Sequence, residues 1–411
     1  MQPVLPFSLG PVLALFPFGA VGLVSWSLWF VRRRRSRRAV PTAGDFATST
    51  SVIVPIFHED VDILDECLGT WLAEEPDELI LVVDVGDRAC QEMLAARDLP
   101  GWVQVVEFAH TGKRSALGVG IRAATCEIVV LSDSDTAWTP GLLREVQLPF
   151  VDPAVGGVGT RQSVAARETS VWRRVASWVL NLRYLDYVPA MGALGSVPCL
   201  SGRTAAYRRS VVLPLLDALE HERFLGRECV AGDDGRLTWL VLGAGHRTVH
   251  QHTAHAVSMF PDSIIGFFRQ RVRWGRNSYR CYLTAAWKGW LWKQPILTQM
   301  TVLQILLTPL TMGIAMAYLL HSFAAHALVR ATAYLLWFLV GRAIRGTSHL
   351  REHPEDLPLL PLVTLVTVIL AVPVKLVALV TMNRQGWLTR GHDGAPDGQS
   401  RASLDGHGVL S

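Results

Sequence analysis

Four long apolar runs interrupt an otherwise mixed pattern of hydrophobic and polar positions, and each predicts a membrane-embedded helix. They cover residues 11–31, 296–320, about 323–341 and 357–382, and a helix of about 20 apolar residues is long enough to cross a bilayer. The arginine-rich stretch 32–38 follows the first run. Because basic residues stay on the cytoplasmic side, we expect the chain after the first run to lie in the cytoplasm.

The last apolar run differs from the others because it contains Pro358, Pro361 and Pro373. A single crossing there would place the basic tail that begins at residue 383 outside the cell. Irregular backbone at membrane depth is tolerated where protein surrounds it. We therefore expect a re-entrant segment, or a helical hairpin bent at its prolines, that returns the tail to the cytoplasm.

Between the first run and residue 295 the pattern changes to short apolar strands that alternate with helix-like segments. The strand-like segments are residues 51–55, 79–83, 103–108 and 127–131, and the helix-like ones are 60–73 and 114–124. Such alternation predicts a mostly parallel sheet with helices on both faces. Ligands bind these sheets beyond the carboxyl ends of the strands, which is where Asp84 and residues 133–135 stand.

The bulk composition agrees with a soluble domain joined to membrane helices. Hydrophobic residues make up 50% of the chain and charged residues 18%, which suits neither an ordinary soluble protein nor a bare helix bundle. The net charge of +4 gives no indication of nucleic-acid binding. The six cysteines are scattered without a C-x-x-C pair, which argues against a zinc site or a disulfide framework and favours reduced thiols.

Two acidic motifs provide candidate metal and base groups. Asp133 and Asp135 follow an apolar strand, where alternate carboxylates can reach one Mg²⁺ or Mn²⁺ ion whose other ligands are waters and substrate phosphates. Asp233 and Asp234 precede a helix predicted at 236–242, and adjacent carboxylates can raise the pKa of one of them to give a general base. Each motif alone also fits an ordinary turn or helix cap, but their order along the chain favours a catalytic site.

The string QRVRW at 270–274 supplies an amide, a guanidinium and an indole. On a helix, Gln270, Arg273 and Trp274 share one face, because residues three and four apart are neighbours there. Those groups are suited to holding a sugar ring beside a diphosphate.

Lys113 is the only lysine before position 288 in a chain whose basic residues are nearly all arginine. A flexible point charge at a phosphate is one interpretation, since lysine and arginine are not equivalent at such sites. Chance retention of one lysine is the other.

The ordered motifs resemble the processive family-2 glycosyltransferases, namely the hyaluronan, chitin and cellulose synthases, from about Ser51 to Arg390. Several strings are most similar to hyaluronan synthase. They are SVIVP at 51–55, GKR at 112–114, SDSDT at 132–136, CLSG at 199–202 with YR at 207–208, GDDGRLT at 232–238, RQRVRW at 269–274, and KLVALVTM at 375–382 with WLTR at 387–390. The resemblance implies an α/β nucleotide-sugar-binding (GT-A-like) cytoplasmic domain with a mostly parallel sheet, flanked by transmembrane helices.

The resemblance also implies roles on the donor side of a site. Asp84 would contact uridine, and Lys113 would contact the nucleotide side of the donor. Asp133 and Asp135 would bind the diphosphate through Mg²⁺ or Mn²⁺, with Asp135 as the direct metal ligand.

On the acceptor side, the same resemblance makes Asp234, beside Asp233, the general base that deprotonates the acceptor hydroxyl. Gln270 and Arg273 would hold the diphosphate, and Trp274 would form the floor for the acceptor sugar. A gating segment over the nucleotide would comprise Trp387, Thr389 and Arg390.

The chain departs from the family pattern at four positions. Val85 follows Asp84 where the family often has further Asp and Gly residues, and Arg203 follows Ser-Gly where hyaluronan synthases usually have Pro. Gly235 replaces the usual Arg, and Trp239 replaces the usual Asn. These changes lie near the donor and acceptor positions and leave the identity of the sugar open.

The expected protein is an inverting, metal-dependent glycosyltransferase in a bacterial plasma membrane, multi-pass, with its catalytic domain in the cytoplasm. It would polymerise UDP-GlcNAc and UDP-GlcA into a hyaluronan-like polysaccharide and translocate it. Its partners would be UDP-sugar donors, the growing polysaccharide and membrane lipid, without nucleic acid. Alternatives are a chitin-like or glucan-like β-linked polymer, a non-processive family-2 transferase, and a non-catalytic membrane subunit.

The expected organisation has six parts. They are a transmembrane helix at 1–31, a basic linker at 32–50, the glycosyltransferase domain at 51–255, amphipathic interfacial helices with the QRVRW string at 256–295, membrane or re-entrant segments at 296–382, and a cytoplasmic tail at 383–411.

Overall fold

The centre of the α/β domain is an eight-stranded sheet in the computed structural model, which describes residues 20–109 and 111–384. The strand order is β3-β2-β1-β4-β7-β6-β10-β5. The strands are β1 (Thr50–Ile56), β2 (Glu78–Asp84), β3 (Val103–Phe108), β4 (Ile128–Ser132), β5 (Thr136–Trp138), β6 (Val155–Val164), β7 (Thr204–Arg208) and β10 (Arg247–Ser258). A separate two-stranded ribbon joins β8 (Arg223–Phe224) to β9 (Arg227–Glu228).

Parallel pairing dominates this sheet, as the alternation of strands and helices predicted. Strands β3, β2, β1 and β4 run parallel to one another, and β6 runs parallel to β10. Strand β7 is antiparallel to both of its neighbours, and β5 is antiparallel to β10. The carboxyl ends of β1 and β4 therefore meet at one edge, which positions the loops that follow them.

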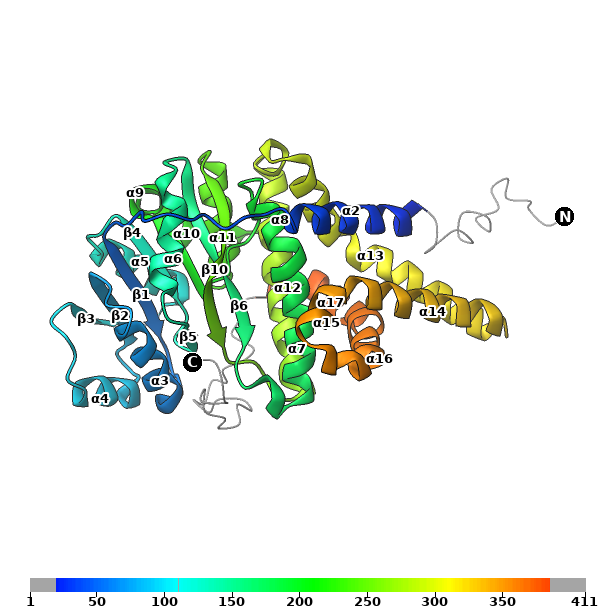
Figure 1. Cartoon of the computed structure of the whole chain (residues 1–411), viewed down its shortest axis with the longest axis horizontal. Coiled ribbons are helices and arrows are strands. Elements are labelled where there is room, and N and C mark those ends of the chain that lie inside the picture. The colour runs from blue at the N-terminus through cyan, green and yellow to red at the C-terminus, as the bar shows by residue number, and fades with distance from the viewer. Residues whose placement is uncertain (1–19, 110, 385–411) are drawn as a thin grey trace.

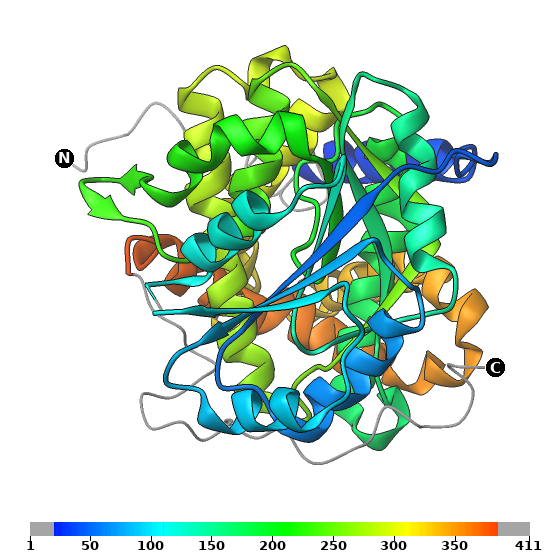
Figure 2. The same cartoon turned by 90° about the vertical axis from the view of Figure 1, so that its left-hand side faces the viewer.

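Helices cover both faces of the sheet (Figure 2). The period-2 alternation of strand side chains sends Val52 and Val54 into one hydrophobic core and Ile53 into the other. The helices of this domain are α3 (Val61–Leu72), α4 (Arg88–Ala96), α5 (Lys113–Ala123), α6 (Leu142–Gln147), α7 (Val171–Asn181), α8 (Val188–Gly192), α9 (Arg209–Val212), α10 (Leu216–Glu220) and α11 (Asp233–Gly243). The helices predicted at 60–73 and 114–124 are thus α3 and α5.

Helices α2 (Ala20–Ser36), α13 (Ile296–Ala324) and α14 (Leu328–Arg345) pack together and extend away from the sheet (Figure 1). By length and composition, two helical segments among the described residues could cross a membrane, Ile296–Ala324 and Pro354–Val380. These are the second and the last of the apolar runs predicted above.

Helix α2 does not stop before the arginine stretch, which had been expected to begin a linker at residue 32. It continues to Ser36, because arginine is a good helix former and cations near a helix C-terminus interact favourably with the helix dipole. Arg32 donates to Gln304 of α13 at 3.1 Å, and Arg33 pairs with the buried Asp186 at 3.2 Å. The arginines therefore join α2 to other parts of the protein.

The segment 256–295, expected to hold amphipathic helices, contains the end of β10 and one long helix, α12 (Ile264–Trp287). Ser263 caps the start of this helix, because its hydroxyl accepts the backbone N–H of Gly266 at 3.2 Å. Gly275 lies in the middle of α12, where a Cβ atom would come within 2.8 Å of Ala378. Its lack of a side chain allows α12 to pack closely against the last apolar run.

Both ends of that last run contact the α/β side of the molecule. The run consists of a 3₁₀ turn (Pro354–Leu359), α16 (Leu360–Thr364), a π-helical turn (Leu365–Ile369) and α17 (Ala371–Val380), and α15 (Thr347–Glu352) precedes it. At its start, Arg174 of α7 donates to Asp356 at 2.7 Å. Beyond its end, Arg276 of α12 donates to Thr381 at 2.9 Å. A re-entrant segment requires such a return to the side from which it entered.

Candidate active site

A cavity of about 1080 Å³ lies beyond the carboxyl ends of β1 and β4. Its walls include the loop after β1, the turn after β4, the end of α7, the loop before β7, the starts of α5 and α11, helices α12 and α14, and the last apolar run. Eight of the residues singled out in the sequence line it: Lys113, Asp133, Asp135, Asp233, Asp234, Gln270, Arg273 and Trp274. Residues separated by up to 161 positions along the chain, from 113 to 274, therefore meet in one site.

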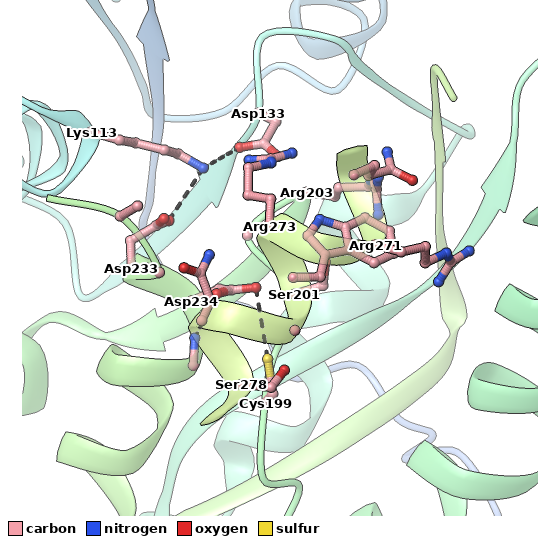
Figure 3. Close-up of a pocket in the computed structure, with 18 of the residues that line it drawn as sticks. Lys113, Asp133, Cys199, Ser201, Arg203, Asp233, Asp234, Arg271, Arg273 and Ser278 are labelled. Carbon is pink, nitrogen blue, oxygen red and sulfur yellow. Dashed lines mark hydrogen bonds and ion pairs between the residues drawn. The ribbon is translucent and has the colours of Figure 1, made fainter. Parts of the chain in front are cut away.

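Lys113 is the first residue of α5 and joins the two acidic motifs. Its Nζ pairs with Asp133 Oδ1, and it lies 3.2 Å from Asp233 Oδ2 (Figure 3). Burial lowers the pKa of Lys113, but the neighbouring carboxylates of Asp133 and Asp233 outweigh it, so the pKa is raised. Lys113 therefore keeps its charge at neutral pH and is a fixed cation at the centre of the site.

The second acidic motif lies inside a helix and not in a turn before it. Helix α11 begins at Asp233, three residues before the predicted start at 236. Gly232 precedes it with φ +81°, a backbone conformation that glycine adopts without strain. Two aspartates in the first turn are also favoured by the positive end of the helix dipole. The early start turns both carboxylates into the cavity.

The two adjacent carboxylates have opposite electrostatic environments. Burial raises the pKa of Asp233, but the charge of Lys113 outweighs it and the pKa is lowered. The pKa of Asp234 is raised, by burial and then by the charge of Asp233. Asp234 Oδ1 accepts the Gly235 N–H at 2.7 Å, and Oδ2 accepts from Cys199 Sγ at 3.7 Å (Figure 3). Asp234 is therefore the stronger base of the pair.

The Asp133–Asp135 motif forms a tight turn between β4 and β5. The Asp133 N–H donates to the Arg203 carbonyl at 3.1 Å, and the Thr136 N–H donates back to the Asp133 carbonyl at 3.2 Å. Among residues 20–109 and 111–384, no three or more His, Cys, Asp or Glu side chains gather as a metal site. Two carboxylates that line the cavity still suit a cation that takes one or two protein ligands and completes its shell with substrate phosphates and water.

The expected helical face on α12 is present, and all three of its residues line the cavity. Gln270 is only 5% exposed, and its Oε1 atom has no hydrogen-bond partner within the part of the chain that the structure describes. Burial lowers the pKa of Arg273, opposed by the nearby carboxylates of Asp133 and Asp135. Arg273 therefore lies close to the acidic turn, and Gln270 offers a buried acceptor to a ligand.

Two arginines that the sequence analysis did not assign to the site contact Trp274. The guanidinium carbon of Arg203 lies 5.0 Å from the centroid of the Trp274 ring, and that of Arg271 lies 4.8 Å from it. Arg203 also lies 4.2 Å from the centre of the Phe260 ring. Arg271 stands inside the QRVRW string, and Arg203 was visible as a departure from the family pattern. Their meeting depends on a contact between a loop and α12 that no local pattern reveals.

One of the remaining expected residues, Asp84, is not part of this cavity. Asp84 ends β2 at the predicted sheet edge, but it is not among the residues that line the cavity. Its Oδ1 atom accepts the Gly86 N–H at 2.8 Å in the turn after the strand. The proposed gating residues Trp387, Thr389 and Arg390 lie outside the described residues.

Sequence comparisons relate the chain to sugar transferases. Residues 47–277 match the model of glycosyltransferase like family 2. The chain is 30% identical over 379 residues to an N-acetylglucosaminyltransferase of Sinorhizobium fredii, covering 90% of this chain and 91% of that protein. It is 29% identical over 398 residues to an N-acetylglucosaminyltransferase of Rhizobium leguminosarum bv. viciae, covering 92% and 91% of the two chains.

A structural comparison agrees with the fold. The mannosyltransferase PcManGT from Pyrobaculum calidifontis, solved in complex with GDP-Man and Mn²⁺, superimposes with a TM-score of 0.64 at 20% sequence identity. The match covers 91% of this chain and 98% of that one. The GT-A-like α/β fold expected from the sequence is therefore confirmed.

Proposed function

This chain belongs to glycosyltransferase like family 2, and from that membership we propose an inverting enzyme that transfers N-acetylglucosamine from UDP-N-acetylglucosamine to a growing β-linked saccharide. The observation that carries the proposal is the Lys113–Asp233–Asp234 arrangement. It supplies one fixed cation and one basic carboxylate in the same cavity.

The choice of sugar rests on the relatives. Both bacterial proteins described above are named N-acetylglucosaminyltransferases and align over nine tenths of this chain. This support favours the chitin-like alternative over the hyaluronan-like polymer that the local strings suggested. The names of these relatives give the sugar but not the nucleotide, so the choice of UDP is also part of our proposal.

Asp234 is the proposed general base. The acceptor hydroxyl attacks the anomeric carbon, its proton passes to Asp234, and the bond from that carbon to the diphosphate oxygen breaks. A single displacement inverts the anomeric centre, so no covalent sugar–enzyme bond is needed. A raised pKa suits the role, because proton transfer is most effective when the pKa of the base approaches the working pH.

Fixed positive charges receive the leaving diphosphate. Lys113 is held in the cavity by Asp133 and Asp233, and Arg273 approaches the same acidic turn from α12. Charges that are positioned before the reaction stabilise developing negative charge without reorganisation.

A divalent cation, Mg²⁺ or Mn²⁺, fits the acidic turn. Because Asp133 is already paired with Lys113, Asp135 is the better candidate for a direct ligand, with Asp133 as its partner. Such an ion would neutralise part of the diphosphate charge.

Trp274 is the proposed floor for the acceptor. Its indole packs edge-on against Phe260, with ring centroids 6.1 Å apart, and it lines the cavity beside Gln270. Aromatic surface suits the apolar face of a sugar ring. The Gln270 Oε1 atom could accept a hydrogen bond from a sugar hydroxyl.

The membrane arrangement is proposed as multi-pass with a cytoplasmic catalytic domain. Support comes from the two long apolar helical segments and from the return of the last run to α12. A re-entrant last run would bring the chain back, at residue 383, to the side on which the cavity lies.

The test is UDP release by the full-length protein, purified in detergent, with Mg²⁺ or Mn²⁺. UDP-GlcNAc and UDP-GlcA are supplied separately and together, and products are digested with chitinase or hyaluronidase. The proposal expects turnover with UDP-GlcNAc alone and a chitinase-sensitive product.

Other outcomes separate the alternatives. Turnover that requires both donors and yields a hyaluronidase-sensitive polymer would restore the hyaluronan-like function. Absence of UDP release from every UDP-sugar, by protein that remains folded, would favour a non-catalytic subunit.

A further inference from the structure

The two residues that precede helix α11 are held from outside that helix. They are Ala231 and Gly232, here called the base turn, because Asp233 and the proposed base Asp234 follow them directly. Helix α11 begins immediately after the base turn, and the carboxylates of its first turn project from that backbone. The position of the base turn therefore decides where the Asp234 carboxylate lies in the cavity.

Arg114 contacts both residues of the base turn. It is the second residue of α5, next to Lys113, and is only 3% exposed. Its Nη2 atom donates to the Ala231 carbonyl at 3.0 Å and to the Gly232 carbonyl at 3.1 Å. Lys113 itself lies 3.2 Å from Asp233 Oδ2 (Figure 3). Adjacent residues of α5 thus hold the start of α11 twice, one through a side chain and the other through the backbone.

The second terminal nitrogen of Arg114 is fixed as well. Its Nη1 atom donates to the Leu219 carbonyl at 3.0 Å and to Glu222 Oε2 at 2.8 Å. The other oxygen of Glu222 lies 3.3 Å from Nη1 of Arg236 in α11. A planar guanidinium presents its donors in a fixed geometry, and here the two terminal nitrogens meet four acceptors. Helix α5 and the base turn are therefore joined in one arrangement.

A second arginine reaches the base turn from helix α12. Arg280 is 5% exposed, and its Nη2 atom donates to the Ala231 carbonyl at 3.4 Å. Its Nη1 atom donates to the Met382 carbonyl, just beyond the end of α17. The Ala231 carbonyl thus accepts from arginines on two helices, which its two lone pairs allow. This contact also joins the base turn to the end of the last apolar run.

Neither arginine is among the residues that line the cavity, so neither is placed to touch a substrate. Their route to the reaction is the base turn and the carboxylates that follow it. The charge of Arg114 acts in the same place: burial raises the pKa of Asp233, but Lys113 and, to a smaller extent, Arg114 lower it.

We propose that Arg114 and Arg280 are positioning residues for the transfer reaction, which hold the base turn so that the Asp234 carboxylate meets the acceptor hydroxyl. This inference rests on the proposed function, since it takes Asp234 as the base. Displacement of a reacting group by about 1 Å costs up to about 10²-fold in rate. Loss of either arginine should therefore slow the chemical step and leave donor binding intact.

The experiment measures kcat and donor KM for UDP release from UDP-GlcNAc by the full-length protein in detergent. For Arg114→Met, kcat should fall roughly 10- to 100-fold. Donor KM should stay close to that of the unaltered chain, because Lys113 and Arg273 remain in the cavity. Arg280→Met should show the same pattern with a smaller fall, since its bond to Ala231 is the longer one.

Arg122→Met is the matched control on the same helix. Arg122 also joins α5 to α10, through two hydrogen bonds to Glu220 at 2.8 and 2.6 Å, but no described contact links it to the base turn. Its kcat should equal that of the unaltered chain.

A conservative variant separates positioning from folding. Arg114→Lys keeps a positive charge opposite Glu222, but a single ammonium lacks the paired nitrogens that serve both sets of acceptors. The proposal expects Arg114→Lys to retain the donor KM and the melting temperature of the unaltered chain while kcat stays low. If neither Arg114 variant folds, Arg280→Met decides alone, by the same division between kcat and donor KM.

Three results would overturn the inference. They are a normal kcat in folded Arg114→Lys or Arg280→Met, an equal fall in Arg122→Met, and a loss that appears in donor KM rather than in kcat. Failure of the proposed function looks different: the unaltered chain releases no UDP from UDP-GlcNAc, or Asp234→Asn releases it at the normal rate. The positioning role alone fails when Asp234→Asn is inactive and the arginine variants are not.

Discussion

Two groups of charged side chains in this protein differ in how their charges are neutralised. Around Asp356, a fully buried carboxylate accepts from Arg174 and from His349 Nε2 at 2.7 and 2.8 Å and also pairs with Arg167. Five cations that line the cavity form a second group, here called the cation cluster: Arg183, Arg203, Arg271, Arg342 and Lys375. No member of the cation cluster pairs with a carboxylate among the described residues. Complete pairing is typical of a structural contact, whereas missing partners indicate a site that a ligand completes.

The group around Asp356, which consists of Asp356, Arg167, Arg174 and His349, shows what complete pairing of a buried carboxylate achieves. His349 stacks on Trp178, with ring centroids 4.7 Å apart, and the Asn181 side-chain amide lies 3.1 Å from its Nδ1. Burial lowers the pKa of His349 to about 4, which agrees with a neutral ring that donates from Nε2 to Asp356. Both carboxylate oxygens of Asp356 have partners, so the start of the last apolar run is fixed to α7.

The largest expected effect concerns another charge without an ion-pair partner, Asp234. Asp234→Asn removes the proposed base while keeping its shape, so UDP release should fall roughly 10²- to 10⁴-fold. Its thermal stability should be unaffected, because no ion pair joins Asp234 to another described residue. The measurement is UDP release together with the melting temperature of the same preparation.

Asp62→Asn is the matched control, since Asp62 is an exposed carboxylate in the first turn of α3. That variant should release UDP at the normal rate. Full turnover by Asp234→Asn would remove the base assignment and, with it, the claim that unpaired charges here serve the reaction.

The next effect is on stability and concerns the paired group. Asp356→Ala leaves Arg167, Arg174 and His349 without their common partner, and breaking a buried ion pair costs about 3–5 kcal/mol. The melting temperature of the detergent-solubilised protein should fall clearly. Arg271→Met should leave it unchanged or raise it, because that substitution removes a charge that has no partner.

Opposite results for these two variants would contradict the distinction between the groups. If Asp356→Ala melted normally while Arg271→Met melted early, pairing would not separate structural from ligand-binding charges in this fold.

A smaller effect is expected in the pH profile. Transfer requires deprotonated Asp234, so kcat/KM should fall as the pH drops through the raised pKa of that residue. Since the charge of Asp233 contributes to the rise, Asp233→Asn should lower the pKa of Asp234 and move this acidic limb to lower pH. The limb is read from UDP release across the acidic range. A limb that stays in place, or moves to higher pH, would show that another group controls it.

Sequence patterns predicted the scaffold and most of the catalytic centre because these follow from local rules. Parallel strands bring residues 133–135 to the sheet edge, and helical spacing puts Gln270 and Trp274 on one face. Asp84 shows the limit of the first rule: its position at the strand end is as expected, but its side chain accepts from Gly86 in the next turn. Position along a strand does not determine where a side chain points.

The two charged groups were not predicted because they depend on contacts between distant segments. Nothing near Asp356 indicates that a carboxylate at the start of an apolar run will meet Arg174 of α7. Likewise, Arg203 and Arg271 meet only through the packing of a loop against α12. Charge patterns in a sequence show how many cations there are, whereas the fold decides which of them find a partner.

The smallest expected effect separates pairing from burial. Arg247 and Asp152 lie 2.6 Å apart, but their side chains are 48% and 38% exposed. Water screens such a pair, so Arg247→Ala should cost only about 0.2–1 kcal/mol, far less than Asp356→Ala. The check is the melting temperature of both variants at low and high salt, where only the Arg247 contribution should shrink. Equal losses in the two variants would mean that pairing alone stabilises the fold; unequal losses would show that a pair must also be buried before its removal is costly.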